Sequence, residues 1–241
     1  MSLPKVSVVI PTHNRSSSLA RLLYSLERLR MKEDFEVVVV DDCSTDDTSR
    51  IADRWCGQDR GFEASYLRLK SNGGPAIARN FGVQAALGEF VAFTDDDCVV
   101  HPEWLSSLMG GIKPPSRIVG VGGRVLPQRN DVFSQYNSFY RILEPPPNLA
   151  YLVTANCAYS RDAVIKAGGF EADISNPGGE DVGLSFRLIS EGYRFAFAED
   201  AIVYHDFRNN PLDFIRTFRN YGEGCRLVTE RYFGNKGQED D

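Results

Sequence analysis

Cysteine is scarce in this sequence, and the few cysteines present do not form a recognisable framework. Only five occur among 241 residues, and no two of them make a Cys-x-x-Cys pair. An odd number in this arrangement argues against a disulfide scaffold and against a structural zinc site. A reducing compartment fits best, so we expect a cytoplasmic protein.

Positive charge and long apolar segments are also lacking. The formal net charge is −6, whereas a nucleic-acid-binding face is basic, so we expect no nucleic-acid partner. No segment reaches the roughly 20 apolar residues of a membrane span. We therefore expect a soluble chain that touches a membrane, if at all, only at its surface. With 42% hydrophobic residues, 241 residues suffice for one domain with a subdomain.

Three motifs common in α/β enzymes are missing after the first predicted strand, residues 6–10. The chain continues there with Pro11, Thr12, His13 and Asn14. This differs from the Asp-x-Asp of haloacid-dehalogenase-type phosphohydrolases and from the glycine-rich basic loop of sugar nucleotidyltransferases. It also differs from the Gly-x-Gly-x-x-Gly of dinucleotide-binding dehydrogenases. These enzyme classes are minor alternatives.

What the sequence does contain is a regular alternation of apolar strands and amphipathic helices. The predicted strands are 6–10, 35–40, 65–69 and 89–94, and the predicted helices are 16–30, 45–56 and 75–87. The order βαβαβαβ predicts an α/β fold, with a Rossmann-like, mostly parallel sheet and helices on both faces.

Polar residues follow three of these strands directly. They are Pro11 to Arg15 (Pro-Thr-His-Asn-Arg), Asp41 with Asp42, and Asp95 with Asp96 and Asp97. Turn formation alone could explain any single cluster. Because ligands of open α/β sheets bind beyond the carboxyl ends of the strands, three such clusters together predict one site.

The Asp95–Asp97 cluster calls for a cation. Adjacent carboxylates raise one another's pKa values unless positive charge is brought in. One or two carboxylates beside phosphates and water are how proteins usually hold Mg²⁺, so we predict a metal-bridged diphosphate site. On an extended chain, Asp95 and Asp97 would face one way and Asp96 the other.

The pattern changes in the second half of the chain. A glycine-broken run at 118–125, an aromatic stretch at 133–140 and prolines at 145–147 suggest a lid or acceptor platform. We divide the chain into an α/β half at 1–120, a second part at 121–210 that contains this platform, and a C-terminal amphipathic helix and tail at 211–241. The helix, at 211–233, is expected to break near Gly222 and Gly224. Packing on the domain is favoured for its apolar side over membrane contact.

A loop at 176–179 precedes a predicted helix at 180–190, which begins with two acidic residues. Steps of about 100° per residue place Asp181 on the apolar arc with Leu184 and Leu188, and Glu180 on the polar side. At a helix N-terminus Asp181 should stay ionised, because the helix dipole favours its charge. It is either a proton acceptor or a simple N-terminal cap.

Taken together, these segments resemble glycosyltransferase family 2, the inverting nucleotide-sugar transferases of the GT-A fold. The similarity runs from residue 6 to about residue 205. It is carried by VSVVIPTHNR, VVVVDDCSTDDT, NGGPAIARNFGVQAALGEFVAFTDDDCVVHPEWL, TANCAYSRDAVIKAGGF and GGEDVGLSFRL.

The resemblance implies a role for each matching residue. Residues 1–120 would bind the nucleotide sugar, and residues 121–210 would bind the acceptor and carry the catalytic base. Thr12 would help to hold the uridine of a UDP-sugar from the first loop, which also contains Pro11, Asn14 and Arg15. Asp42, after the second strand, would contact the nucleobase. Arg79 would lie near the nucleotide. Asp95 would complete the acidic motif, Asp96 would reach the ribose, and Asp97 would bind Mg²⁺ or Mn²⁺ on the diphosphate. Asp181 would be the base that deprotonates a hydroxyl acceptor, which could be a glycan, a lipid-linked sugar or a small molecule.

Two positions need separate comment. Cys43 stands where many members of the family have glycine, which puts the tightness of that turn in doubt. His205 resembles a histidine that completes the metal shell in some GT-A enzymes, although an ordinary strand-end histidine is the competing interpretation.

A catalytically inactive nucleotide-sugar-binding or scaffolding protein with the same fold is the alternative to an enzyme.

Overall fold

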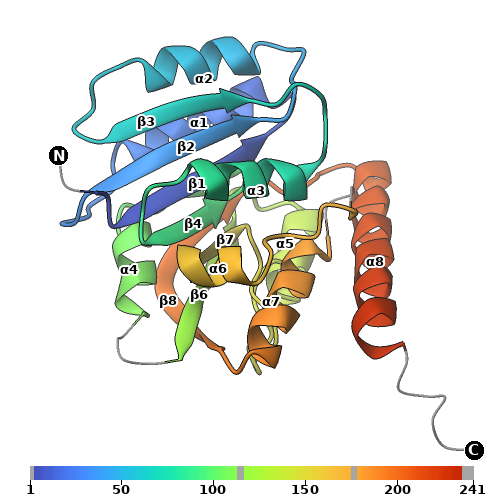
Figure 1. Cartoon of the computed structure of the whole chain (residues 1–241). Coiled ribbons are helices and arrows are strands. Elements are labelled where there is room, and N and C mark those ends of the chain that lie inside the picture. The colour runs from blue at the N-terminus through green and yellow to red at the C-terminus, as the bar shows by residue number, and fades with distance from the viewer. Residues whose placement is uncertain (1–2, 113–116, 175–177, 235–241) are drawn as a thin grey trace, which may run out of the picture.

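A computed structural model describes residues 3–112, 117–174 and 178–234. Its strands form one eight-stranded sheet in the order β3-β2-β1-β4-β7-β6-β8-β5 (Figure 1). The strands are β1 (Val6–Thr12), β2 (Phe35–Asp41), β3 (Glu63–Arg68), β4 (Phe90–Thr94), β5 (Cys98–Val100), β6 (Ile118–Pro127), β7 (Asn156–Ser160) and β8 (Arg194–His205). The helices are α1 (Ser16–Leu26), α2 (Thr48–Cys56), α3 (Pro75–Ala85), α4 (Trp104–Gly110), α5 (Val132–Phe139), α6 (Arg161–Lys166), α7 (Glu180–Ser190) and α8 (Pro211–Phe233).

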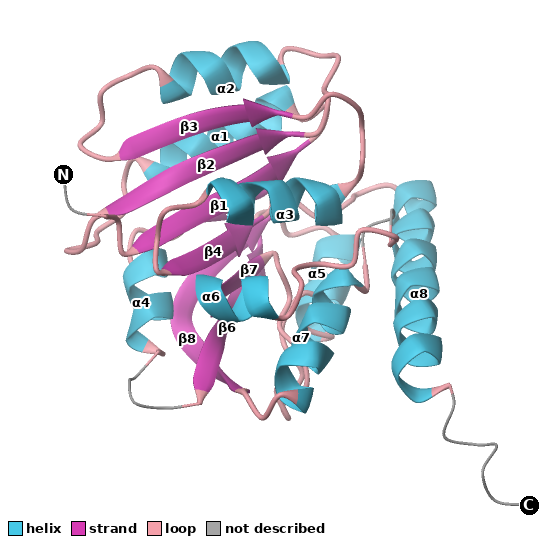
Figure 2. Ribbon diagram, in the orientation of Figure 1, coloured by secondary structure: helices cyan, strands magenta, loops and turns pink. Residues whose placement is uncertain are grey.

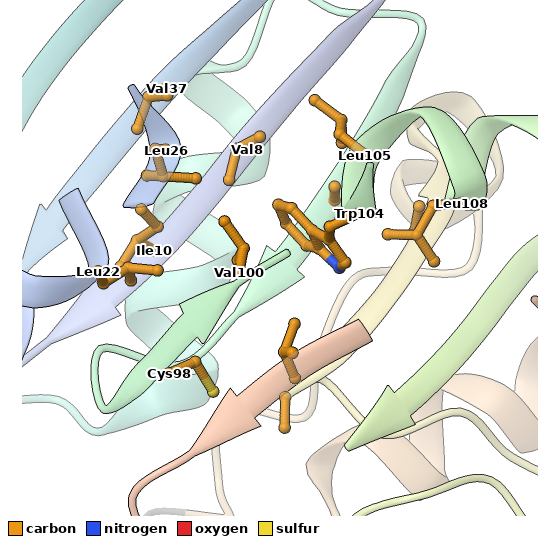
Figure 3. Packing of buried hydrophobic residues seen from close by; sticks show 14 of the residues in the cluster. Val8, Ile10, Leu22, Leu26, Val37, Cys98, Val100, Trp104, Leu105 and Leu108 are labelled. Atoms are coloured by element: carbon orange, nitrogen blue, oxygen red, sulfur yellow. The ribbon is translucent and has the colours of Figure 1, made fainter. Parts of the chain in front are cut away.

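The first half of the sheet is parallel, as the alternating pattern predicts. β1 pairs with β2 and β4, and β2 pairs with β3, all in parallel register. Side chains of β1 alternate between two cores: Val8 and Ile10 face one side, and Val9 faces the other. Figure 3 shows Val8 and Ile10 in the first core, together with Trp104.

Helices cover both faces of the sheet, which confirms the predicted fold class. Residues of α1, α2 and α4 share one hydrophobic core, and residues of α3, α6 and α7 share the other. Figure 2 shows α3, α6 and α7 in front of the strands and α1 behind them. The second half of the sheet is mixed, because β7 runs antiparallel to both β4 and β6, whereas β6 and β8 are parallel. Residue 120, the predicted end of the donor-binding part, falls within β6.

Three predicted helices are shorter than expected. Helix α3 ends at Ala85 rather than at residue 87, because the backbone of Ala86 is extended, with ψ at 139°. Helix α1 ends at Leu26 rather than at residue 30, because Arg28 and Leu29 donate to carbonyls three residues back and so tighten the last turn. Helix α2 begins at Thr48 rather than at residue 45. The side-chain oxygen of Asn14 accepts the N–H of Thr45 at 2.7 Å and thus holds that residue in the preceding loop.

The predicted break in the C-terminal helix is wrong, since α8 runs without interruption from Pro211 to Phe233. Asn210 caps it by accepting the N–H of Asp213. An ion pair between Arg219 and Glu223 spans Gly222. Gly224 is buried where the helix crosses the loop before α7, so this glycine serves a close approach between backbones rather than a break.

Helices long enough and apolar enough to cross a bilayer are absent from residues 3–112, 117–174 and 178–234.

Candidate active site

The carboxyl ends of β1, β2 and β4 open onto one cleft of about 580 Å³. All of the predicted site residues except Asn14 and Asp181 line it. They are Pro11, Thr12, Arg15, Asp42, Arg79, Asp95, Asp96, Asp97 and His205. Figure 2 shows the arrowheads of β1 and β2 pointing toward the side on which α8 stands. Clusters separated by more than 80 residues therefore meet at one edge of the sheet, as parallel topology requires.

The three consecutive aspartates diverge instead of alternating along a strand. The N–H of Cys98 donates to the carbonyl of Asp95 at 3.0 Å, which closes a turn directly after β4. Asp95 accepts from Arg79 at 2.8 Å, and Asp97 accepts from Arg15 at 2.7 Å. The expected two-faced arrangement is thus replaced by a turn that separates the carboxylates.

Asp96 points into the protein. It is buried, and its Oδ2 accepts a hydrogen bond from Thr12 Oγ1 at 2.7 Å. Burial, followed by repulsion from Asp97, raises the pKa of Asp96 to about 7. This is the repulsion that an added cation would relieve.

Asp97 and His205 come from neighbouring strand ends and form the candidate metal centre. Asp97 Oδ1 lies 3.2 Å from His205 Nε2, and potential ligand atoms of Asp97, Cys98 and His205 all lie within 4.8 Å of one another. The Nδ1 atom of His205 is buried and has no hydrogen-bond partner among the residues described. A carboxylate beside an imidazole suits Mn²⁺, and a carboxylate beside a diphosphate suits Mg²⁺, so the residues fit a divalent metal.

Asp42 organises the loop that follows β3. Its two carboxylate oxygens accept the N–H groups of Gly73 at 2.7 Å and Gly74 at 2.8 Å, directly before α3. The turn after β2 remains tight despite Cys43, which adopts a left-handed φ of +62°. Asn14, also left-handed at φ +52°, stays outside the cleft, where it bonds the loop before α2.

Arg79 joins the strand-end cluster to the helix that carries Asp181. Its side chain is buried, with Nη2 donating to Asp95 and Nη1 donating to Glu180, both at 2.8 Å. The helical phase placed Glu180 on the polar side of α7, and this expectation is wrong. Glu180 is buried because the first turn of α7 is enclosed by neighbouring elements, and the Arg79 cation compensates its charge.

Asp181 also lies in the interior and does not reach the surface of the cleft. Its carboxylate accepts the backbone N–H of Val182 at 2.9 Å and of Thr154 at 3.3 Å. Burial, followed by the charge of Glu180, raises the pKa of Asp181 to about 7. The expectation that the helix dipole keeps this group ionised therefore needs correction, since desolvation outweighs the dipole.

The loop before α7 is only partly described. Residues 176 and 177 of the predicted loop at 176–179 lie outside the described residues. Gly178 and Gly179 have φ values of +114° and +100°, which favour glycine. A side chain on Gly179 would lie 2.7 Å from the carbonyl carbon of Gly224, so α8 packs directly on this loop.

Sequence reasoning missed the contribution of the C-terminal helix to the cleft. Arg216, Asn220 and Tyr221 of α8 line it, as does Arg208, which precedes the helix. Burial raises the pKa of Tyr221, and the negative charges of Asp95, Asp97, Asp181 and Glu180 raise it further. Amphipathic spacing located the helix, but it contains no information on which distant residues the helix covers.

Comparison with known proteins then decides the family. The family model described as Glycosyl transferase family 2 matches residues 7–168. The chain belongs to this family. It is 33% identical over 238 residues to a pre-mycofactocin glycosyltransferase of Mycobacterium tuberculosis, covering 94% of this chain and 48% of that protein. It is 30% identical to glycosyltransferase AglE of Haloferax volcanii, covering 86% of this chain and 68% of that protein.

Solved structures support the GT-A fold that the resemblance implies. The mannosyltransferase PcManGT of Pyrobaculum calidifontis, determined in complex with GDP-Man and Mn²⁺, aligns with a TM-score of 0.73 at 22% identity. The alignment covers 94% of this chain and 65% of that one. Residues 1–349 of Staphylococcus aureus TarS, in complex with UDP-GlcNAc, align with a TM-score of 0.66 at 23% identity, covering 93% and 65%. The chain spans about half the length of its pre-mycofactocin relative.

Proposed function

We propose that this family 2 member transfers a sugar from a nucleoside-diphosphate donor, expected to be UDP-linked, to a hydroxyl acceptor with inversion of the anomeric carbon. The observation that carries the proposal is the cleft in which Asp42, Asp97 and Arg79 meet. Asp181 lies within electrostatic range of Arg79, on a separate helix. Donor binding and proton removal are therefore assigned to different elements.

In this proposal the strand ends bind the donor. Thr12 and Asp42 hold the nucleoside, and Asp96 reaches the ribose. Pro11 and Arg15 shape the first loop, with Asn14 supporting it from behind, and Asp95 keeps Arg79 in place. The backbone supports this role for Asp42, since its bonds to Gly73 and Gly74 fix its carboxylate at the entrance to α3.

Departure of the nucleoside diphosphate needs compensation for the negative charge that develops on it. Mg²⁺ or Mn²⁺ held by Asp97 and His205 would supply this as a Lewis acid, without a proton donor. The cationic side chains of Arg15 and Arg208 lie 2.7 Å and 3.7 Å from Asp97 Oδ2. They are placed to attract the anionic donor to the same oxygen cluster.

Removal of the acceptor proton is assigned to Asp181. A base works best when its pKa is near the working pH, and burial brings the pKa of Asp181 to about 7. Within residues 3–112, 117–174 and 178–234, its carboxylate is held by backbone N–H groups only, so its remaining lone pairs can accept a proton. Such a base contributes about 10²–10⁴ in rate.

The acceptor side is assigned to the aromatic surface between α5 and α8. Phe133 and Tyr136 pack on Phe214 with ring centroids 5.0 Å and 5.5 Å apart, while Phe139 and Tyr140 remain exposed. Such a surface offers stacking faces to a glycan acceptor. Contact of α8 with a membrane carrying a lipid-linked acceptor is the other possibility for this surface.

Thermal unfolding with a panel of UDP- and GDP-sugars, each with and without Mn²⁺ or Mg²⁺, tests the donor. A ligand that binds the native state raises Tm, and we expect the increase to need the metal. Asp97→Ala should lose most of this increase. Asp200→Ala, an exposed carboxylate on the same strand as His205, is the matched control and should keep it.

Release of nucleoside diphosphate with the best donor and a panel of acceptors then tests turnover. Metal-dependent donor binding without any release, even to water, would favour the inactive binding protein instead. A donor that stabilises the Asp97→Ala variant as strongly as the wild type would contradict the assignment of the metal centre.

A further inference from the structure

Glu180 has no role in the chemistry proposed above. It is nevertheless buried as deeply as Asp96, Asp97 and Asp181, to which roles are assigned. Only 4% of its side chain is exposed. Its Oε1 accepts from Arg79 Nη1 at 2.8 Å, and its Oε2 accepts the N–H of Gly178 at 2.8 Å. An acidic side chain in this position is costly unless both oxygens are satisfied, as they are here.

Arg79 is equally enclosed, with 5% of its side chain exposed. One guanidinium nitrogen bonds Asp95 after β4, and the other bonds Glu180 at the start of α7, 101 residues away from Arg79 in the sequence. The planar guanidinium fixes the angle between these two bonds. Arg79 thus links the acidic strand end to the first turn of the helix that carries Asp181.

The carboxylates near Arg79 do not all pair with it. Three carboxylates, Asp95, Glu180 and Asp181, lie near one guanidinium, but only Asp95 and Glu180 contact it. Among the residues that the structure describes, only backbone N–H groups donate hydrogen bonds to Asp181. Both ion-pairing nitrogens of Arg79 are therefore occupied by residues other than the proposed base.

We propose that Arg79 and Glu180 are positioning residues for Asp181, which rests on the proposed function of Asp181 as the base. Arg79 ties the first turn of α7 to Asp95 and so fixes the base relative to the donor. Glu180 occupies Arg79, so that no cation pairs with Asp181 and its carboxylate stays able to take up a proton.

The surroundings of Asp181 agree with this division of roles. Desolvation is the largest cause of its raised pKa, the charge of Glu180 raises it further, and Arg79 and the N–H groups of Thr154 and Val182 lower it. Several thiols and phenols also interact with it, and these are uncharged near neutral pH. They include Tyr151, Cys157, Tyr159, and Tyr221 and Cys225 of α8.

Two variants separate this proposal from a purely structural ion pair. Glu180→Gln removes the charge beside Asp181, and Arg79→Lys keeps a positive charge but loses the two-pronged geometry. Glu191→Gln, an exposed position at the other end of α7, is the matched control. Tm of each variant reports the structural contribution separately.

The first measurement is the pH dependence of kcat/KM for release of nucleoside diphosphate from the donor that stabilises the protein. In Glu180→Gln the fall in activity on the acid side should move to lower pH by about one pH unit, because a neighbouring negative charge is lost. Arg79→Lys should leave this limb in place but lower kcat about 10- to 100-fold through misplacement of the base. Glu191→Gln should match the wild type in both respects.

The second measurement needs neither donor nor acceptor. In protein labelled with ¹³C at aspartate carboxyl groups, the Asp181 resonance is assigned as the one missing from Asp181→Asn, and its titration is followed by NMR. Glu180→Gln should shift its midpoint to lower pH, in the same direction as the activity limb. A midpoint unchanged in Glu180→Gln, together with an unmoved activity limb, overturns the proposal.

The two levels of the proposal fail in different ways. If Asp181→Asn retains half of the turnover, the base assignment is wrong whatever Glu180 does. If Asp181→Asn is inactive while Glu180→Gln keeps the wild-type limb and midpoint, only the positioning role is wrong. Should Arg79→Lys fail to fold, the titration of the Glu180→Gln protein still decides between these results.

Discussion

The acidic side chains at the carboxyl ends of β1, β2 and β4, here called the rim, and those in the first turn of α7 differ in which carboxylate near the site is paired with a cation. At the rim, Asp97 is paired with Arg15, and Asp42 is held by two backbone N–H groups of the neighbouring loop. At α7, Arg79 pairs with Glu180, and the adjacent Asp181 has no ion pair within the described part of the chain. A site that binds an anionic donor collects positive charge, whereas a base must be free of it.

The two regions also differ in their access to solvent. The rim opens onto the cleft, whereas Asp181 is enclosed. The charge of Asp181 contributes to the raised pKa values of Tyr221 and Cys225, which belong to α8. Figure 1 shows α8 standing next to α7 at the edge of the molecule. The surroundings of Asp181, the proposed base, therefore depend on the docking of the C-terminal helix, and those of the rim depend on the sheet.

The largest effect is expected from Asp181→Asn, which leaves the rim intact. Transfer should fall by about 10²–10⁴ because the proton acceptor is lost, while metal-dependent stabilisation by the donor should persist. Asp162→Asn, an exposed position on α6, serves as the control. A variant that keeps half the wild-type turnover would break the contrast between a binding rim and a catalytic helix.

Asp181→Asn should also change the pH dependence of the stability of the protein. The pKa of Asp181 is about 7 in the folded protein and lies above its unfolded value of 3.8, so its stabilising contribution is complete below pH 3.8 and disappears as the pH rises through about 7. Asp181→Asn should accordingly raise Tm at pH 8 and change it little near pH 4. Equal shifts at both pH values would show that the buried charge is not the cause.

A smaller effect is expected where α8 packs on the loop before α7. In Gly224→Ala the new methyl group would overlap the carbonyl oxygen of Gly178, so we expect a loss of about 1–3 kcal/mol in the free energy of unfolding. Gly222→Ala, two residues away and with open space around it, should gain up to about 1 kcal/mol through helix propensity. Denaturant unfolding measures both, and equal values for the two variants would contradict the proposed docking contact.

The smallest effect is expected in the rim, at the turn after β2. Cys43→Gly should relieve left-handed strain of about 1–2 kcal/mol, partly offset by the greater entropy of unfolded glycine, for a net gain below about 1 kcal/mol. Cys43→Ala keeps the Cβ atom and should show no such gain. If the alanine variant stabilises the protein as much as the glycine variant, backbone strain is not the reason.

Prediction from the sequence succeeded where the physics is local or follows from topology. Apolar runs identified β1, β2 and β4, and parallel connectivity placed the polar clusters that follow them at one edge. It failed where neighbours far along the chain decide the outcome. The helical wheel of α7 assumes a single packed face, so it could not show that Arg79 and the loop at Gly178 enclose Glu180.

The sequence by itself thus determined the α/β order, the family and the meeting of Asp42, Asp96 and Asp97, because hydrophobic periodicity and the direction of parallel strands are written into adjacent residues. Only the tertiary structure decided which carboxylate pairs with Arg79, how deeply Asp181 is buried and what α8 covers. Those outcomes depend on desolvation and on contacts between segments 27 or more residues apart. A pattern along one segment contains no information about either.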